Sequence, residues 1–244
     1  MKVMVLTSPQ KIVMQEIAKP SLKGEHDVLI KVCMAGICGS EVNGFKGKSA
    51  RHKPPLIMGH EFVGVVEDAG ASVNDLEIGD RVVINPLISC QKCEACLSGR
   101  QNVCPNRILI GVDLPGGYSE YVVVPRSTVY SIPQTMSFTK AAMVEPLANI
   151  VHMMDKNMVG IVGSLAIIGA GTQGLLALQL AKNLGISPVI VVDIDLYRLG
   201  IAEKLGADFI VNSKEEDPIK RIKDLTCGKG VDWAIDAVGT SLTR

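Results

Sequence analysis

Short apolar runs fill the first part of the chain, and Gly, Pro, Asn and Asp residues separate them. Runs of this length between turn residues are typical of short β-strands, and few stretches have a helical period. We therefore predict a compact, irregular β-barrel for this part. The runs are VMVLT, DVLIKVCMAG, FVGVVEDAG, DRVVINP and YSEYVVVP.

After Pro133 the pattern changes to a different class of fold. Residues 137–156 predict a helix that is disturbed at Pro146. Uniformly apolar strands then alternate with amphipathic helices, which indicates βαβ units and a parallel sheet. The strands are SLAII, PVIVVD, FIVN and VDWAID, and the helices are TQGLLALQLAKNLG, LYRLGIAEKLGA and SKEEDPIKRIKDLT. We place the boundary between two domains at residues 1–150 and 151–244.

The predicted parallel sheet is incomplete. A doubly wound dinucleotide-binding sheet has about six strands, and the sequence reaches Arg244 soon after the fourth. An apolar sheet edge left open would favour association with another chain. We therefore expect either a truncated chain or an edge that a partner covers.

Charge and composition narrow the choice of function. Lys plus Arg and Asp plus Glu each number 25, and no basic run appears, which argues against a nucleic-acid partner. Without a signal peptide or an apolar segment that could span a bilayer, we expect a cytoplasmic protein with no membrane contact. In a reducing compartment, the seven cysteines favour metal binding over disulfides. Cys33 and Cys227 look like buried apolar positions and have no assigned role.

Four cysteines with the spacing C-x2-C-x2-C-x7-C form the strongest local signal. Four thiolates this close together can surround one Zn²⁺ ion tetrahedrally and stabilise a lobe that lacks a core of its own. Since sulfur would occupy every position, this zinc would be structural. The alternative is four unrelated buried cysteines. The residues are Cys90, Cys93, Cys96 and Cys104.

A glycine-rich turn, G-x-G-x-x-G, follows the strand SLAII and opens a helix, the context in which this motif binds a dinucleotide. Asp193 ends the next strand, where its carboxylate can bind ribose hydroxyls and repel a 2′-phosphate, so we expect NAD. Arg198 would lie under the adenine or be a solvated helix residue. The alternative is an ordinary glycine turn with a helix-capping Asp. The expected cofactor contacts are Gly169, Gly171, Thr172, Gln173, Gly174, Asp193, Arg198 and, after the fourth strand, Asp236, Val238 and Gly239.

Three further segments of the sequence suggest a second metal site. Cys38 lies in the predicted turn GICGSE, His60 and Glu61 lie in the predicted turn MGHEFVG, and Glu145 precedes Pro146. Each would be structural if it stood alone. Together they offer one soft, one borderline and two hard ligands, a set that suits a catalytic zinc with an open position.

The segment Gly59–Val73, GHEFVGVVEDAGASV, matches the zinc alcohol dehydrogenase signature G-H-E-x2-G-x5-G-x2-V. The turn with Cys38, the four-cysteine lobe, the EPLA helix and the GAGTQG turn occur in the same order as in that family. The chain therefore resembles the zinc-dependent medium-chain alcohol dehydrogenases, above all their polyol (sorbitol), sugar-acid and threonine branch. The resemblance implies an α/β fold in which a GroES-like β-barrel catalytic domain is joined to a Rossmann domain with a doubly wound parallel sheet.

The resemblance also implies roles for single residues. Cys38 and His60 would ligate the catalytic zinc, and Glu61 and Glu145 would be a direct ligand and an exchanging or water-bridged partner, in either order. Ser40 would begin proton transfer from the substrate hydroxyl. The chain departs from the family at the next residue, Glu41, where Asp is usual, and at position 43, where Asn replaces a frequent His. Because Asn cannot take up a proton, the outer relay would run through ribose, water or another side chain.

The implied activity is transfer of hydride from a secondary alcohol, such as a polyol or sugar acid, to NAD⁺ by a homo-oligomer, either a dimer or a tetramer. One alternative is a non-catalytic fragment that binds NAD and zinc. A second is a zinc-free reductase on the same scaffold, which would have no need of the residues around Cys38. A zinc ribbon that binds nucleic acid is disfavoured by the balanced charge, and aromatic residues that could stack on bases make up only 4% of the chain.

Overall fold

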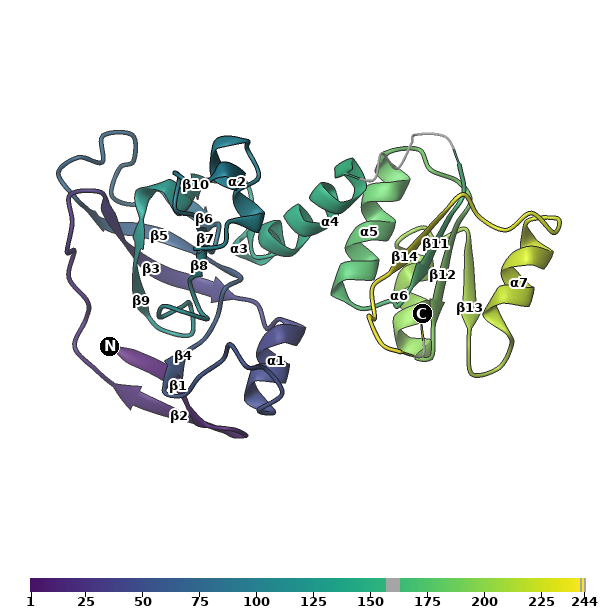
Figure 1. Cartoon of the computed structure of the whole chain (residues 1–244), viewed down its shortest axis with the longest axis horizontal. Coiled ribbons are helices and arrows are strands. Elements are labelled where there is room, and N and C mark those ends of the chain that lie inside the picture. The colour runs from purple at the N-terminus through teal and green to yellow at the C-terminus, as the bar shows by residue number, and fades with distance from the viewer. Residues whose placement is uncertain (157–162, 242, 244) are drawn as a thin grey trace. The chain divides into compact units, whose positions relative to one another are not determined.

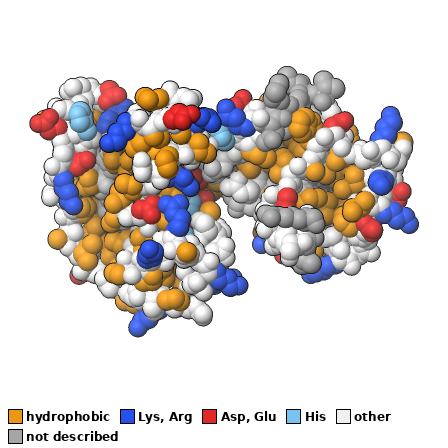
Figure 2. Space-filling model, in the orientation of Figure 1, with side chains coloured by type: hydrophobic (Ala, Val, Ile, Leu, Met, Phe, Trp, Pro, Cys, Tyr) orange, Lys and Arg blue, Asp and Glu red, His pale blue; other side chains and the backbone are white. Residues whose placement is uncertain are grey.

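The computed structural model describes residues 1–156, 163–241 and 243, and the chain divides into two compact units, Met1–Glu145 and Pro146–Arg244 (Figure 1). No helix in these described ranges is long and apolar enough to cross a membrane. On the face shown in Figure 2, Lys and Arg side chains are scattered among Asp and Glu side chains.

Unit 1 is built from antiparallel strands, as the apolar runs predict. One sheet has the order β10-β6-β5-β3-β9, a second has the order β2-β1-β4, and β7 pairs with β8. Alternate residues of these strands face the core, which centres on the fully buried Phe62 and Ile30. The strands are β1 (Lys2–Ser8), β2 (Lys11–Glu16), β3 (Asp27–Ala35), β4 (Leu56–Ile57), β5 (Phe62–Ala69), β6 (Arg81–Ile84), β7 (Leu87–Ile88), β8 (Ile108–Leu109), β9 (Tyr121–Pro125) and β10 (Val129–Ser131).

The helices of unit 1 are short and connect these strands. They are α1 (Gly39–Phe45), α2 (Glu94–Leu97), α3 (Phe138–Ala141) and the 3-10 turns η1 (Gln101–Val103) and η2 (Arg126–Thr128). The segment GICGSE, predicted as a turn, opens α1 instead. Cys38 is its N-cap, and the Glu41 carboxylate accepts the Cys38 N–H, which completes a capping box.

The expectation that Cys33 and Cys227 are buried is wrong, because both are exposed. Cys33 lies where the pairing of β3 with β5 shifts register, between Val32 and Met34. Cys227 follows the last helix with a φ of 54°, in the left-handed region where chains leave regular structure.

The helix predicted over residues 137–156 is divided in two. Ser137 caps α3, and a second helix, α4, spans Val144–Lys156. The break therefore precedes Pro146, which lies in the first turn of α4. Proline is tolerated there because a first-turn amide has no acceptor within its own helix.

Unit 2 contains the predicted parallel sheet, with the order β13-β12-β11-β14. Residues Val189 and Val191 of β12 pack with α5 and α6, whereas Ile190 and Val192 pack toward α7. Helices therefore cover both faces, which explains why β12 is apolar throughout. The elements are β11 (Leu165–Ile168), α5 (Thr172–Asn183), β12 (Val189–Asp193), α6 (Leu196–Lys204), β13 (Phe209–Asn212), α7 (Pro218–Leu225) and β14 (Trp233–Asp236).

One predicted helix in unit 2 is shorter than expected. The sequence of residues 213–226 predicts a helix with an acidic first turn, but α7 begins only at Pro218. Asp217 caps it by accepting the N–H groups of Ile219 and Lys220. An N-cap Asp followed by Pro is a strong start signal, and it excludes the acidic residues Glu215 and Glu216 from the helix.

Candidate metal centres and cofactor site

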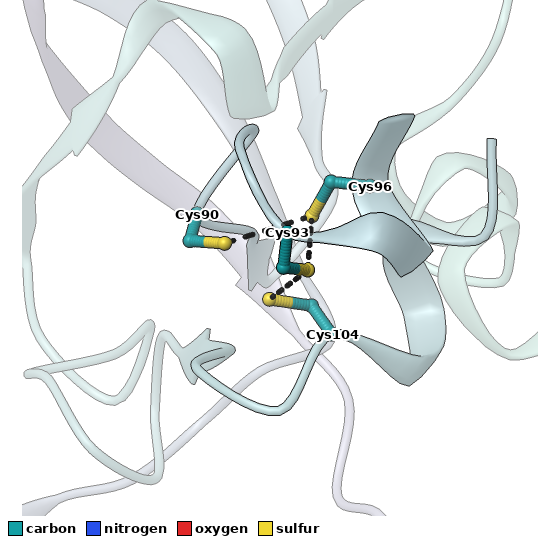
Figure 3. Close-up of side chains that lie close together, drawn as sticks. All are labelled: Cys90, Cys93, Cys96 and Cys104. Carbon is teal, nitrogen blue, oxygen red and sulfur yellow. Dashed lines mark hydrogen bonds between the residues drawn. The ribbon is translucent and has the colours of Figure 1, made fainter. Parts of the chain in front are cut away.

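The four cysteines of the lobe point their sulfur atoms toward one another (Figure 3). The Sγ–Sγ distances are 3.4 Å for Cys93–Cys96, 3.8 Å for Cys93–Cys104 and 3.9 Å for Cys90–Cys96. Four sulfurs about 2.3 Å from a central zinc would be about 3.8 Å apart. The spacing therefore fits a tetrahedral zinc, and it is far longer than a disulfide bond.

The charges of these thiols also favour a cation. Backbone N–H groups of Lys92 and Cys93 lower the pKa of Cys90 to about 6. The N–H of Cys96 acts in the same direction on Cys93, but burial and the neighbouring thiols outweigh it and raise the pKa of Cys93 to about 11. Burial would raise the pKa of Cys96, but hydrogen bonds with Cys93 and Cys104 outweigh it and lower that pKa. Thiolates therefore form readily at Cys90 and Cys96, whereas deprotonation of Cys93 needs a positive ion nearby.

A second group lies around the start of α1. The ligand atoms of Cys38, His60 and Glu61 all lie within 4.8 Å of one another. Cys38 is the N-cap of α1, and His60 and Glu61 lie between β4 and β5. Cys38 and His60 are partly exposed and Glu61 is buried. One sulfur, one nitrogen and one oxygen make three protein ligands, the number that leaves a fourth zinc position open.

Glycines hold the turn that contains His60. Gly59 has a φ of 98°, and an added Cβ there would lie 2.6 Å from Tyr118 Cδ1. Gly116 packs so closely that its added Cβ would lie 2.2 Å from the Gly59 carbonyl oxygen. A Cβ at Gly36 would lie 2.4 Å from Glu61 Oε2, so glycine leaves the space that the carboxylate occupies.

Sequence reasoning gave no role to Glu41, but the structure places its carboxylate, which is 1% exposed, behind the cluster. Glu41 Oε1 accepts the backbone N–H of His60 at 3.0 Å and lies 2.9 Å from His60 Nδ1, without the alignment of a hydrogen bond. With a carboxylate beside Nδ1, the other ring nitrogen is left for a metal, as in carboxylate–histidine–zinc sites. The sequence does contain a signal for this role, because Glu41 stands three residues after Cys38, which is the spacing of a capping box.

The residues around Cys38, His60 and Glu61 stabilise a positive charge on the His60 ring. Burial disfavours the protonated ring, but the nearby Cys38 thiol and Glu41 carboxylate outweigh it and raise the pKa of His60 to about 10. Burial would raise the pKa of Glu41, yet the adjacent His60 ring and the hydrogen bonds from the Tyr118 hydroxyl and the Cys38 N–H lower it. Burial raises the pKa of Glu61, against the opposing effect of His60. A divalent cation would satisfy the same acceptors that hold the proton on His60.

Three other predicted or neighbouring residues have different surroundings. Ser40 and Asn43 are exposed on α1. Glu145, partly buried in the first turn of α4, is not part of the group whose ligand atoms converge within 4.8 Å. Its role as a ligand stays a prediction.

The glycine turn of unit 2 connects β11 to α5, as predicted. Gly169 has a φ of 103°, and its added Cβ would lie 2.6 Å from Val238 Cγ2. Gly171 is the N-cap of α5 and has no atom within 4 Å of an added Cβ, so its backbone is open to an approaching ligand. Thr172 and Gln173 form the first turn of α5, whose N–H groups and dipole favour a phosphate.

Asp193 ends β12 and is only 8% exposed. Its Oδ2 accepts the Ala170 N–H at 2.6 Å, and its Oδ1 accepts those of Ile194 at 2.7 Å and Asp195 at 2.9 Å. A carboxylate offers about four acceptor positions. Asp193 therefore fastens the glycine turn to β12 and retains capacity for about one ribose hydroxyl. The helix-capping role belongs to Asp195, which accepts the Tyr197 and Arg198 N–H groups.

A pocket of about 540 Å³ lies just beyond the carboxyl ends of β12 and β13. Arg198, predicted as a cofactor contact, lines it, whereas sequence reasoning missed Tyr197 and Lys214. The full lining is Ile194, Asp195, Leu196, Tyr197, Arg198, Asn212, Lys214 and Glu215. This is the edge of a parallel sheet at which a dinucleotide's adenosine half is bound.

Val238 and Gly239 follow β14 at the same edge of the sheet. Both donate their backbone N–H groups to Asp236 Oδ1 at 2.9 Å. Val238 contacts the Gly169 turn, so the end of β14 and the glycine motif lie side by side.

Comparison with known families agrees with this arrangement. Residues 24–134 match the alcohol dehydrogenase GroES-like domain, and residues 174–244 match the zinc-binding dehydrogenase domain. The L-threonine 3-dehydrogenase of Bacillus subtilis (strain 168) is 39% identical over 231 residues, which cover 93% of this chain and 66% of that enzyme. The sorbitol dehydrogenase of the same organism is 36% identical and is matched over 98% of this chain and 69% of its own length.

A solved structure described as a zinc-binding dehydrogenase from Sinorhizobium meliloti 1021, bound to NADP, superposes with a TM-score of 0.93 at 35% identity. The match covers 99% of this chain and 71% of that one. The protein belongs to the zinc-type medium-chain alcohol dehydrogenase family, a family of oxidoreductases, and combines a GroES-like domain with a Rossmann-type parallel sheet. The chain spans about two thirds of the length of the curated relatives it matches.

Proposed function

We propose that this chain supplies the zinc and NAD sites of a dehydrogenase that oxidises the secondary hydroxyl group of a small polar substrate. The observation that carries the proposal is the convergence of Cys38, His60 and Glu61 within 4.8 Å. The same chain contains a glycine-rich turn in which close packing requires Gly169 and Gly174, while the backbone at Gly171 is open. If these residues served only to hold the fold together, the chain would not need both a group of converging ligand atoms and a glycine turn at the start of a helix.

Two bound groups would supply the chemistry. Zinc held by Cys38, His60 and Glu61 would act as a Lewis acid that lowers the pKa of a bound hydroxyl. NAD⁺ on the glycine turn would accept the hydride. Glu61 is the carboxylate we assign as direct ligand, because its side chain lies in the cluster. Glu145 is assigned as the exchanging partner.

The chain's own residues would hold these groups and carry the proton away. Cys38, His60 and Glu61 leave one ligand position for the hydroxyl. Ser40, exposed beside Cys38 at the start of α1, would receive the proton. Asn43 lacks a titratable group, so the proton would leave through ribose or water. The four-cysteine lobe would hold a structural zinc.

The polar substrate class and the choice of NAD rest on separate arguments. The two curated relatives are named for threonine and sorbitol, which are both small and polar. Asp193 places a carboxylate at the end of β12, where it would repel a 2′-phosphate. We therefore expect a polyol, sugar acid or hydroxy amino acid as substrate and NAD in preference to NADP. The free state of all seven cysteines fits a reducing compartment such as the cytoplasm. A homo-oligomer stays a prediction.

The test combines metal content, NAD binding and turnover. Zinc is measured in the purified chain and in Cys38→Ser, with Cys33→Ser as the matched control, because Cys33 is exposed and outside both clusters. We expect Cys38→Ser to lose one zinc equivalent and NAD-linked turnover of polyols, while Cys33→Ser keeps both. Full turnover by Cys38→Ser would refute the proposal. NAD and zinc binding without any turnover by the unaltered chain would favour the non-catalytic alternative.

A further inference from the structure

We propose that Tyr118 is a positioning residue for the metal held by Cys38, His60 and Glu61. Its hydroxyl group would act on the metal through Glu41, without touching metal or substrate. The inference rests on the proposed metal site, but it concerns a residue with no expected chemical role.

The Tyr118 hydroxyl completes a set of donors around one buried carboxylate. It donates to Glu41 Oε2 at 2.7 Å, the same oxygen that accepts the Cys38 N–H at 2.8 Å. The other oxygen, Oε1, faces His60. The Glu41 carboxylate thus links the backbone of Cys38 to the backbone and ring of His60. The Tyr118 hydroxyl is the side-chain donor that fixes the direction of this carboxylate.

The backbone holds Tyr118 where it can do this. Its N–H donates to the Met58 carbonyl at 2.9 Å, and its carbonyl accepts the Met4 N–H at 2.8 Å. Its ring contacts Gly59, directly before His60. The phenol ring therefore packs against the turn that contains His60 and Glu61. Its oxygen also lies 3.0 Å from the Gly36 carbonyl, a second acceptor for the single hydroxyl proton.

The side chain also has a simpler role to weigh against this one. Tyr118 packs beside Leu6, Leu56 and Met58 in a small apolar cluster. A ring that only fills space would need no hydroxyl. Phenylalanine has the same ring and lacks only the oxygen, so Tyr118→Phe separates packing from positioning.

The experiment measures metal affinity, not activity. Zn²⁺ is titrated into the metal-free full chain against a competing chelator, and Co²⁺ absorption identifies the site, because four thiolates absorb more strongly than one. Removing a partner behind a metal ligand typically weakens affinity 10- to 100-fold. For Tyr118→Phe we expect a loss of about tenfold at the Cys38 site, with the four-cysteine site unchanged. Tyr130→Phe is the matched control, since Tyr130 is 54% exposed on β10.

A second pair of variants tests whether Tyr118 acts through Glu41. Glu41→Gln alone should weaken the Cys38 site, and adding Tyr118→Phe to it should cost little more, because the hydroxyl has lost its carboxylate. Unchanged affinity in Tyr118→Phe, or fully additive losses in the double variant, would overturn the inference. If the unaltered chain binds metal only at the four cysteines, the proposed function itself fails. The two failures are therefore distinguishable.

Discussion

Gly174 packs directly against Gly169, so that a Cβ added to Gly174 would lie 1.8 Å from the Gly169 carbonyl oxygen. The first turn of α5 and the turn after β11 are thus in backbone contact. This contact sets the direction in which the N-terminus of α5 points, and with it the amide groups that would bind a pyrophosphate. A substitution of Gly174, the third glycine of the motif, therefore tests the role of the whole turn.

Gly174→Ala should loosen this turn and reduce NAD affinity. Because the clash is with backbone, we expect the free energy of unfolding of unit 2 to fall by about 1–3 kcal/mol. Fluorescence titration with NADH and chemical denaturation measure the two effects. Gly200→Ala on α6 is the control, since nothing lies within 4 Å of an added Cβ there. It should leave affinity unchanged and raise helix stability by about 0.5–1 kcal/mol. Equal affinity in both variants would contradict the assigned role of Gly174.

Asp193→Asn should weaken both the fold and the choice of cofactor. The two carboxylate oxygens accept three backbone N–H groups, and an amide can replace only one of these oxygens. We expect stability to fall by about 1–3 kcal/mol and the ratio of NAD to NADP affinity to decrease. Isothermal titration with each cofactor measures that ratio. Asp217→Asn, at the N-cap of α7 and outside the pocket lining, is the control, because Asn caps helices as well as Asp does. An unchanged ratio would mean that Asp193 is structural only.

Cys104→Ser should remove the structural zinc without removing the other one. Cys104 is fully buried and its sulfur lies 3.8 Å from that of Cys93, so its loss breaks the tetrahedron. We expect one zinc equivalent fewer by elemental analysis and faster proteolysis of residues 90–107, since a coreless lobe depends on its metal. Cys227→Ser, at an exposed cysteine outside the cluster, should change neither. Unchanged zinc content in Cys104→Ser would refute this assignment.

Asp208 should make the stability of unit 2 depend on acid pH. Burial would raise the pKa of Asp208, but the Val189 N–H and the Lys182 ammonium outweigh it and lower that pKa. A lowered folded-state pKa adds stability above the ordinary Asp pKa of about 3.9. That stability is lost as the pH falls through the folded value. Thermal melts from pH 7 to pH 3 should therefore show a smaller loss for Asp208→Asn than for the unaltered chain. Asp224→Asn, at an exposed residue, should behave like the unaltered chain.

Much of the fold could be predicted because its signals are local. The apolar strand β12 and the helix after Gly171 follow from patterns within a few residues, and the sheet order β13-β12-β11-β14 is the doubly wound order expected for such βαβ units. Errors arose where a nearby cap decided a boundary. Asp217 starts α7 later than the charge pattern indicates, and Cys38 with Glu41 starts a helix where a turn was predicted.

The sequence by itself predicted the four-cysteine cluster and the glycine turn, since their spacing is local. It predicted the group of Cys38, His60 and Glu61 from ligand chemistry and family resemblance, and the structure brings these three residues together. Only the tertiary structure decided which distant groups support them. Tyr118 and Glu41 are 77 positions apart, and Ala170 and Asp193 are 23 apart. Such pairs depend on strand register and on where glycines permit close approach, and no local pattern encodes either. The chemistry of the site is therefore visible in the sequence, while its support is visible only in the fold.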